Sequence, residues 1–192
     1  ELVQTRSHII PILESRGVDL VLCGHSHSYE RSMLIDGHYG ASGTFNPQTM
    51  VKWAGNGSDL GGVNSTGDFV TNQLMAGGVY QKTAATARSG AVYAVVGASS
   101  SVQVWSNGSS ALVNPNPHPA HLVNLLAIGS LVLEVDGHRL RGQFIGETGV
   151  VRDDFTILKG ARYRLNPAIP HTVSGNQGVA FPITRTGATA FA

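Results

Sequence analysis

The chain has 192 residues, a length that fits one domain or one domain with part of another. Hydrophobic residues make up 42% of it and charged residues 13%, so the composition supports a packed core and excludes a disordered chain. The formal net charge of +1 argues against nucleic acid or an anionic membrane as a partner. No apolar run approaches the roughly 20 residues that a membrane-spanning helix needs.

The chain opens with a helix signal followed directly by a strand signal. Residues 1–17 predict a helix with one apolar face, kinked or restarted at Pro11 and capped by Gly17. The run Val18–Cys23 predicts a continuous apolar strand buried on both faces. Cys23 is the single cysteine, which rules out an intrachain disulfide, and its apolar surroundings predict a buried, inert thiol.

The middle of the chain is harder to interpret. Residues 32–40 predict a second short strand that ends in a turn at Asp36-Gly37, and residues 91–101 predict a strong buried strand. Residues 40–90 are rich in Gly, Ser, Thr and Asn, and they are too long for a plain loop, so we expect a functional region or short strands. Residues 114–121 predict a rigid loop punctuated by proline.

The C-terminal third gives the clearest pattern. Three strands over about residues 131–136, 139–145 and 153–158 predict an antiparallel meander, with a hairpin turn at Asp136-Gly137. We predict one unit over residues 1–160, a linker over residues 161–174, and the start of an all-β module over residues 175–192.

Two imidazoles follow the first predicted strand, in the tetrapeptide Gly24-His25-Ser26-His27. Because residues i and i+2 of an extended segment project to the same side, the two rings form half of a metal pocket, and Gly24 gives the backbone room to turn. Imidazole suits zinc, iron, manganese-like and copper ions, so the spacing does not choose the metal. Taken alone, the pair fits a polar loop after a strand equally well.

The residues around this pair resemble the last signature of the calcineurin-like metallophosphoesterases, most closely the purple acid phosphatase-like branch. That signature has an apolar strand, Gly-His-x-His, and then an aromatic residue, Glu, Arg and Ser. The matching residues here are Gly24, His25, His27, Tyr29, Glu30, Arg31 and Ser32. The resemblance extends over residues 1–160. A fainter one, over Phe181–Gly187, is to the opening of a Calx-beta domain, an all-β sandwich.

The resemblance implies the C-terminal part of an α/β four-layer fold, in which a β-sandwich is flanked by helices and a dinuclear metal centre lies at the ends of strands. It implies that His25 and His27 each bind a different one of two metal ions, which are iron, zinc or manganese. The substrate class would be a phosphate ester, attacked by a metal-bound hydroxide.

The family's other metal ligands have no counterpart here. Its earlier signatures supply an Asp, a bridging Asp, an Asn followed by His, and a further His, with a Tyr added in the purple branch, and their matching region would precede Glu1. We therefore assign no catalytic residue, expect this chain alone to be inactive, and expect a missing N-terminal portion or another chain to complete the site. The alternatives are a non-catalytic structural or assembly protein derived from the fold, and a module that binds one metal ion through the two imidazoles and water.

Other polar residues are assigned structural or surface roles. Tyr29, Glu30 and Arg31 are interpreted as a hydrogen-bond and ion-pair set behind the site. His38 is interpreted as a turn residue, and His118 and His121 as loop residues that could line a substrate mouth but lie outside the metal site. The remaining candidates are expected at exposed positions: His8, His138, His171 and the pair Asp153-Asp154.

Three Asn-x-Ser/Thr sequons, at Asn56, Asn64 and Asn107, and a content of 24 glycines point toward an exported chain. We therefore expect a secreted or cell-surface protein, with bacterial export.

Overall fold

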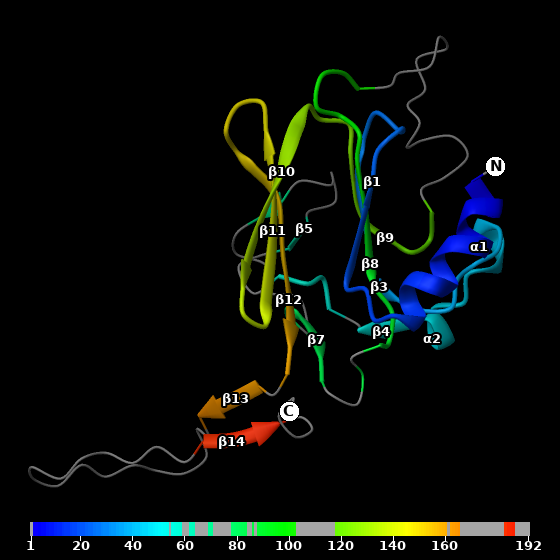
Figure 1. The fold of residues 1–192 in the computed structure, drawn as a ribbon. Helices are drawn as coiled ribbons and strands as arrows, with labels where there is room; N and C mark the ends of the chain where they lie inside the picture. The colour runs from blue at the N-terminus through cyan, green and yellow to red at the C-terminus, as the bar shows by residue number, and fades with distance from the viewer. Residues whose placement is uncertain are drawn as a thin grey trace, which may run out of the picture.

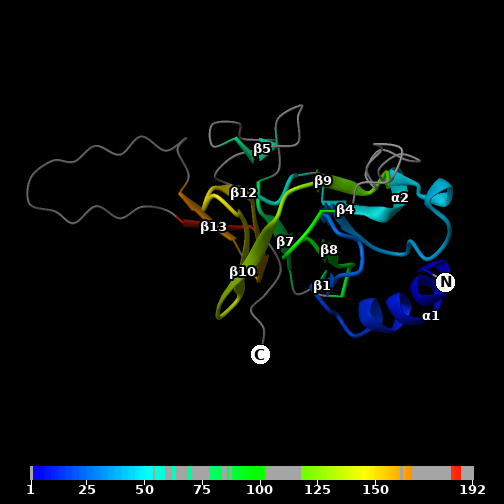
Figure 2. The same ribbon diagram turned by 90° about the horizontal axis from the view of Figure 1, so that it is seen from above.

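The computed structural model describes residues 2–53, 55–58, 62–63, 69–70, 78–83, 86, 88–102, 118–160, 162–165 and 183–186. Two four-stranded sheets face each other, and the helix α1 (Leu2–Ser15) lies along the outer side of one of them (Figures 1 and 2). The predicted α/β class is confirmed. The four-layer arrangement stays a prediction, because the described helices lie on one side of the sandwich.

The helix α1 forms where the sequence predicts it, with one difference at Pro11. It runs through Pro11 without interruption, so the expected restart at that residue is wrong. Gly17 has φ 75°, a left-handed conformation that favours glycine and is typical of the residue that ends a helix. The backbone N–H of Gly17 donates to Glu14 O at 2.9 Å, which satisfies one of the last carbonyl groups of the helix.

The first sheet has the strand order β1-β8-β2-β9. Its strands are β1 (Leu20–Cys23), β8 (Val92–Val96), β2 (Tyr29–Ser32) and β9 (His121–Leu125). β1 and β8 are parallel, whereas β2 is antiparallel to both β8 and β9. The carboxyl ends of β1 and β8 therefore meet at the same edge of the sheet, and the predicted metal loop begins there.

The prediction that the first strand is buried on both faces is wrong. Leu22 is 46% exposed and Cys23 is exposed as well. The physical reason is position, because β1 is the outermost strand of its sheet and pairs with β8 alone among the described strands. The thiol of Cys23 nevertheless approaches Ala94 O at 3.8 Å, and burial and then the Glu30 carboxylate raise its pKa.

The second sheet contains the predicted meander. It has the strand order β10-β11-β12-β7, with β10 (Gly129–Asp136), β11 (Arg139–Gly146), β12 (Val151–Lys159) and β7 (Tyr80–Lys82). The first three strands are antiparallel, as predicted, and Gly137 has φ 52° in the turn between β10 and β11. β7 is parallel to β12.

The region from residue 40 to residue 90 contains short elements, as expected. β3 (Leu34–Ile35) pairs with β4 (Val51–Trp53), and β5 (Gly62–Val63) pairs with β6 (Phe69–Val70). The short helices η1 (Ser42–Thr44) and α2 (Pro47–Met50) lie between β3 and β4. The side chain of Asn46 accepts from Gln48 N at 3.0 Å and so caps α2, which starts at a proline.

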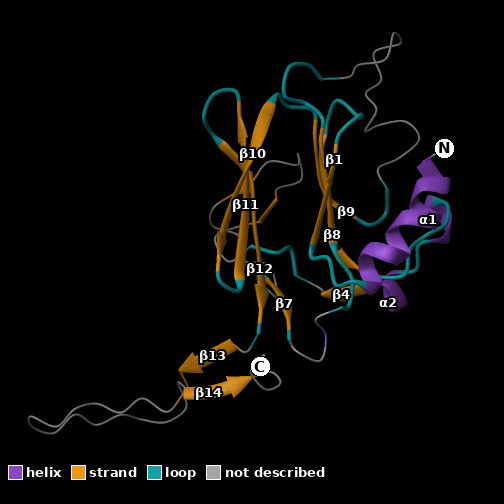
Figure 3. Ribbon diagram, viewed as in Figure 1, coloured by secondary structure: helices purple, strands orange, loops and turns teal. Residues whose placement is uncertain are grey.

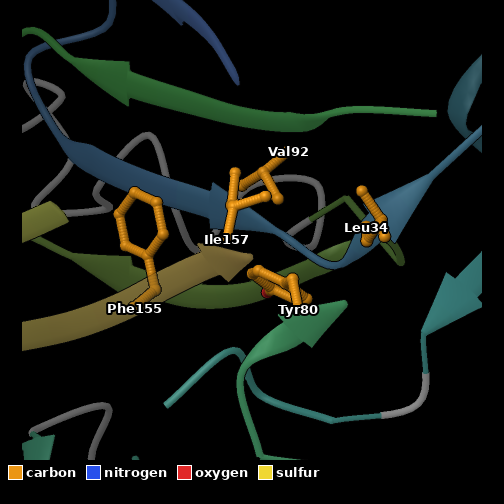
Figure 4. Close-up of a cluster of buried hydrophobic side chains, with 5 residues drawn as sticks. All are labelled: Leu34, Tyr80, Val92, Phe155 and Ile157. Carbon is orange, nitrogen blue, oxygen red and sulfur yellow. The ribbon is translucent and has the colours of Figure 1, made fainter. Parts of the chain in front are cut away.

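The core lies between the two sheets. One cluster joins Leu34, Tyr80, Val92, Phe155 and Ile157 (Figure 4), and a second joins Tyr29, Val123, Leu125 and Phe144. In the second cluster, the rings of Tyr29 and Phe144 stack with centroids 4.1 Å apart. Each cluster draws residues from both sheets, so neither sheet can bury its apolar face without the other.

Two further strands lie near the C-terminus, where β13 (Arg162–Leu165) pairs with β14 (Ile183–Thr186) (Figure 3). β13 falls within the predicted linker and β14 within the predicted all-β module. The division into these units stays a prediction. Residues 114–117 of the predicted proline loop over residues 114–121 lie outside the described residues. Among the described helices, none is long and apolar enough to span a membrane.

Candidate metal centre

The loop that carries His25 and His27 connects β1 to β2 at the carboxyl end of β1, near the top of the first sheet in Figure 1. Both histidines are exposed, whereas Ser28 and Tyr29 directly after them are fully buried. The two imidazoles therefore lie at the surface on a short loop whose C-terminal end is anchored in the core. This is where open α/β sheets place their ligand sites.

The backbone of this loop turns at His25 and not at Gly24. His25 has φ 77°, and among the described residues it is the one non-glycine with a positive φ. That conformation costs a side-chain-bearing residue about 1–2 kcal/mol and is concentrated at functional sites. Gly24 has no such φ, and a Cβ added to it would meet open space. The expectation that Gly24 gives the turn its room is wrong.

The glycine that this loop does require is Gly97, which follows β8. A Cβ at Gly97 would lie 1.7 Å from Ser26 O, so only glycine lets the two backbones approach so closely. The N–H of Gly97 also donates to Ser28 O at 3.1 Å. Sequence reasoning missed Gly97, although a glycine directly after a strongly apolar strand was the available signal.

A side chain also reaches the second imidazole. Ser101 Oγ lies 3.2 Å from His27 Nδ1. When the nitrogen of a histidine that faces away from a metal is held by a hydrogen bond, the other nitrogen is oriented for coordination. A proton on Nδ1 of His27, donated to Ser101, would leave the lone pair of Nε2 available.

The described residues do not supply a complete metal centre. Among them, no group of three or more His, Cys, Asp or Glu side chains is arranged to hold a metal ion. Two imidazoles are suitable ligands for iron, zinc or manganese, but zinc sites use at least three protein ligands and a dinuclear centre needs more. His25 and His27 by themselves therefore do not fit the complete dinuclear centre that the resemblance implies.

A buried ion pair lies behind the loop. Arg31 Nε and Nη2 donate to the two carboxylate oxygens of Asp153 at 2.5 Å and 2.8 Å, and Tyr29 Oη donates to Asp153 Oδ2 at 2.6 Å. Burial would lower the pKa of Arg31, but the Asp153 carboxylate, together with Tyr80 and Tyr29, outweighs burial and raises that pKa. Burial, followed by the same carboxylate, raises the pKa of Tyr29. The interpretation of Tyr29 and Arg31 as structural residues agrees with these contacts.

The expectation of a solvated Asp153-Asp154 pair is wrong. Both residues are buried within β12. Asp154 accepts from Arg141 Nη2 at 2.6 Å and from Gln143 Nε2 at 2.7 Å, across the pair of strands β11 and β12. Each carboxylate thus forms an ion pair with an arginine, Asp153 with Arg31 and Asp154 with Arg141. The ion pair offsets the cost of removing the carboxylate from water.

The remaining histidines divide into two groups. His8 and His138 are exposed, as expected, and His171 lies outside the described residues. His38, which was expected in a turn, forms a cluster with His118 and His121, which were expected together in one loop. The rings of His38 and His118 have centroids 4.9 Å apart. No contact joins these three rings to His25 or His27, so the cluster and the candidate metal loop are separate features among the described residues.

Comparison with known proteins defines a fold likeness and no family. No protein-family model matches the chain, and no curated protein matches it. Among solved structures, the chain is similar to the purple acid phosphatase PPD1 isolated from yellow lupin (Lupinus luteus) seeds, with a TM-score of 0.46 and 18% identity. The match covers 78% of this chain and 19% of the lupin protein, so the chain spans about a fifth of that protein's length. The likeness concerns the overall fold, is weak, and assigns no activity.

Proposed function

We propose that this chain is the C-terminal portion of a dinuclear metal-dependent phosphoesterase of the calcineurin-like class, similar to its purple acid phosphatase branch. The observation that carries the proposal is the position of His25 and His27, two exposed imidazoles of a Gly-His-x-His signature at the carboxyl end of a parallel strand. The rest of the signature, Tyr29 to Ser32, forms the buried strand that holds them.

The local packing supports a preorganised site. Gly97 fixes the backbone of the loop, and the buried pair of Arg31 and Asp153 fixes the strand that follows it. Because metal sites require ligand positions held to within fractions of an ångström, such a support is expected under a metal loop. A plain surface loop would have no need for the strained backbone at His25.

In the complete protein, His25 and His27 each hold one of two ions of iron, zinc or manganese. The metal pair would supply activation of a water for attack on a phosphate ester and neutralise the phosphoryl oxygens. The remaining ligands come from a preceding segment or from another chain, and this chain alone is inactive. Such a protein acts as a secreted or cell-surface enzyme, and residues 175–192 open an all-β module that resembles a Calx-beta domain.

A second candidate, a non-catalytic assembly protein derived from this fold, is favoured by a separate observation. Leu22 on the edge strand β1 and Ile12 on α1 are 46% and 57% exposed, although both belong to elements whose apolar faces would ordinarily be covered. The same surface would be covered by the missing part of the enzyme under the first proposal. Metal content separates the two candidates.

The test is elemental analysis of the purified protein by mass spectrometry, together with the intact mass of every chain present. We expect bound iron, zinc or manganese, and we expect His25→Ala and His27→Ala each to lower the amount bound. His8→Ala is the matched control, because His8 is an exposed histidine on α1 and should leave the metal content unchanged. Equal metal content in all four proteins would remove His25 and His27 from the site.

The intact masses complete the decision. About two ions per molecule, found with a larger or second chain, support the phosphoesterase proposal and justify an assay on phosphate esters. A protein that contains a chain larger than this one of 20.2 kDa, or a second chain, and that binds none of the three metals even when they are added, contradicts it and supports the assembly protein.

A further inference from the structure

Three imidazoles and a guanidinium meet between α1 and the first sheet, away from the candidate metal loop. They are Arg6 on α1, His38 in the loop after β3, His118 before β9, and His121 at the start of β9. The rings of His118 and His121 have centroids 5.4 Å apart, and Phe45 packs edge-on against His38 at 5.3 Å. His38 is only 4% exposed. We call these four polar residues the histidine cluster.

The protonation of His118 follows from its contact with the backbone. The N–H of Ala120 donates to His118 Nδ1 at 3.1 Å, so Nδ1 carries no proton. A neutral imidazole has its proton on the other nitrogen, which places it on Nε2 of His118. That nitrogen lies 3.0 Å from Nε2 of His38, so His118 donates and His38 accepts.

The protonation of His38 is then fixed as well. Its Nε2 also accepts from Arg6 Nη1 at 3.2 Å, so two donors share one lone pair. The proton of neutral His38 must therefore sit on Nδ1, a buried atom with no hydrogen-bond partner in the described part of the chain. Arg6 Nη1 donates in addition to Gly40 O at 2.7 Å. The cluster thus joins α1, the loop after β3 and the approach to β9 through one imidazole nitrogen.

This arrangement distinguishes the pair from a metal site. Nε2 of His118 carries a proton, and the lone pair on Nε2 of His38 accepts from two donors. Neither nitrogen is therefore free to coordinate a metal ion. The two rings bind each other directly.

We propose that the histidine cluster is an acid-sensitive latch, closed while both His38 and His118 are neutral and opened by the addition of a proton to Nε2 of His38. On His38 the added proton would face the N–H groups of Arg6 and His118, so a donor replaces the one acceptor on which both contacts depend, and both contacts are lost. A proton added to His118 can go only to Nδ1, where it breaks the contact with the N–H of Ala120 and leaves the Nε2–H donor to His38 in place.

The surrounding charges favour the neutral, closed state. Burial, followed by the positive charge of Arg6, lowers the pKa of His38. Burial, His121, Arg6 and His38 together lower the pKa of His118 to about 4. The acidic group of the cluster's surroundings, Glu30, lies 3.5 Å from Nδ1 of His121, which also contacts Asn124 Oδ1 at 2.8 Å. Burial lowers the pKa of His121 in spite of Glu30 and Asn124.

The pH window follows from these directions. A histidine whose pKa is lower in the folded state than its ordinary 6.5 binds protons less readily when folded than when unfolded. The latch therefore contributes fully above about pH 6.5, and its contribution is lost as the pH falls through the lowered pKa of His38. The other attachment of α1, at Glu14, lies two turns farther along the helix, so we expect opening to be confined to the part of α1 around Arg6.

The test is a pH titration of the ¹⁵N-labelled full chain by long-range ¹H–¹⁵N correlation of the imidazole rings, which reports the protonated nitrogen of each histidine directly. At neutral pH we expect His118 with its proton on Nε2 and His38 with its proton on Nδ1. We expect His118 to titrate with a midpoint of about 4 and His38 with a midpoint below the ordinary 6.5. The amide signals of Arg6 and Gly40 should shift with the midpoint of His38, and that of Ala120 with the midpoint of His118.

Three variants test which ring controls the shift. In His118→Gln the side-chain amide can still donate to His38 but cannot titrate, so the acid-induced shift at Gly40 should remain and should follow His38 alone. In His38→Gln that shift should be lost. His8→Gln removes an exposed histidine from the same helix and should leave that shift unchanged. If His118→Gln does not fold, the titration of the unaltered chain still decides.

Three results would overturn the latch. One is a proton on Nδ1 of His118 at neutral pH. Another is a titration midpoint for His38 at or above the ordinary histidine value of 6.5. The third is a shift of the Nε2 signals of both His38 and His118 on addition of zinc alone, which would make the pair a metal site.

Discussion

His25 holds a backbone conformation that usually belongs to glycine, while its neighbour Gly24 holds an ordinary one. The strain of the signature loop therefore lies on a residue proposed to bind metal. It is maintained by Gly97, whose missing side chain lets the end of β8 lie against Ser26 O. At the scale of single residues, the loop is shaped by a contact from another strand and not by its own glycine.

This contact leads to a prediction about two glycines. Gly97→Ala should lower the free energy of unfolding by about 1–3 kcal/mol, since a Cβ would overlap a backbone oxygen that cannot easily move. Gly24→Ala is the matched control. It lies in the same loop with open space around its Cα, so its effect should stay within about 0.5 kcal/mol. Urea unfolding of both variants measures the difference, and equal stabilities would show that Gly97 does not hold the loop.

At the scale of elements, the sequence predicts those features that depend on near neighbours. The meander of β10, β11 and β12 was predictable because alternation and an Asp-Gly turn act within a few residues. The placement of β8 between β1 and β2 was not predictable. β8 begins about sixty to seventy residues after those two strands begin, and no local pattern links it to them. The exposure of β1 was missed for the same reason, since burial depends on which strands lie beside it.

In and around the candidate site, too, local features were predictable and long-range contacts were not. The pair His25 and His27 was predictable from a local signature. The burial of Asp153 was not, because its partner Arg31 is 122 residues away, and the pairing of His38 with His118 spans 80 residues. Long-range polar contacts leave no periodicity in a sequence. Asp153 was therefore expected at an exposed position, and His38 was expected to be a turn residue.

The helix α1 depends on one buried carboxylate, which carries a second prediction. Glu14 accepts from the N–H of Gly37 at 3.0 Å, from Tyr39 Oη at 2.8 Å and from Tyr93 Oη at 2.5 Å. Glu14→Gln replaces one acceptor oxygen by a donor and leaves at least one of these groups unpaired. We expect it to cost about 1–3 kcal/mol of the free energy of unfolding.

The pH dependence of that cost has a definite sign. Burial raises the pKa of Glu14 in the folded state, so the folded chain binds this proton more tightly than the unfolded chain does. The contribution of Glu14 is therefore largest at low pH and falls as the pH rises through its folded pKa. The cost of Glu14→Gln, measured by urea unfolding, should be larger in acid than at neutral pH. The exposed Glu147→Gln is the control, and a cost that rises with pH would contradict the assignment.

At the scale of the whole molecule, the two sheets are joined by polar as well as apolar contacts. Arg31 on β2 of the first sheet forms its ion pair with Asp153 on β12 of the second, and both side chains are about 1% exposed. Arg31 Nη1 also donates to Tyr80 Oη on β7 at 2.6 Å, and its guanidinium lies 5.0 Å from the ring centroid of Phe155. One arginine thus contacts two strands of the second sheet, β12 and β7.

Removing only one member of this pair should therefore be more damaging than removing both. Arg31→Met leaves the Asp153 carboxylate buried without its cation, and we expect a loss of about 3–5 kcal/mol of the free energy of unfolding. The double variant Arg31→Met with Asp153→Leu removes both charges from the low-dielectric interior, so it should be more stable than Arg31→Met by itself. Lys52→Met, which breaks the pair of Lys52 with Asp36 at 3.8 Å near the surface, should change stability by about 0.5 kcal/mol or less. Urea unfolding of these three variants and of the unaltered chain measures the differences in the free energy of unfolding. A double variant less stable than Arg31→Met would mean that the second sheet depends on Asp153 for more than its pairing with Arg31, with Tyr29 the first residue to examine.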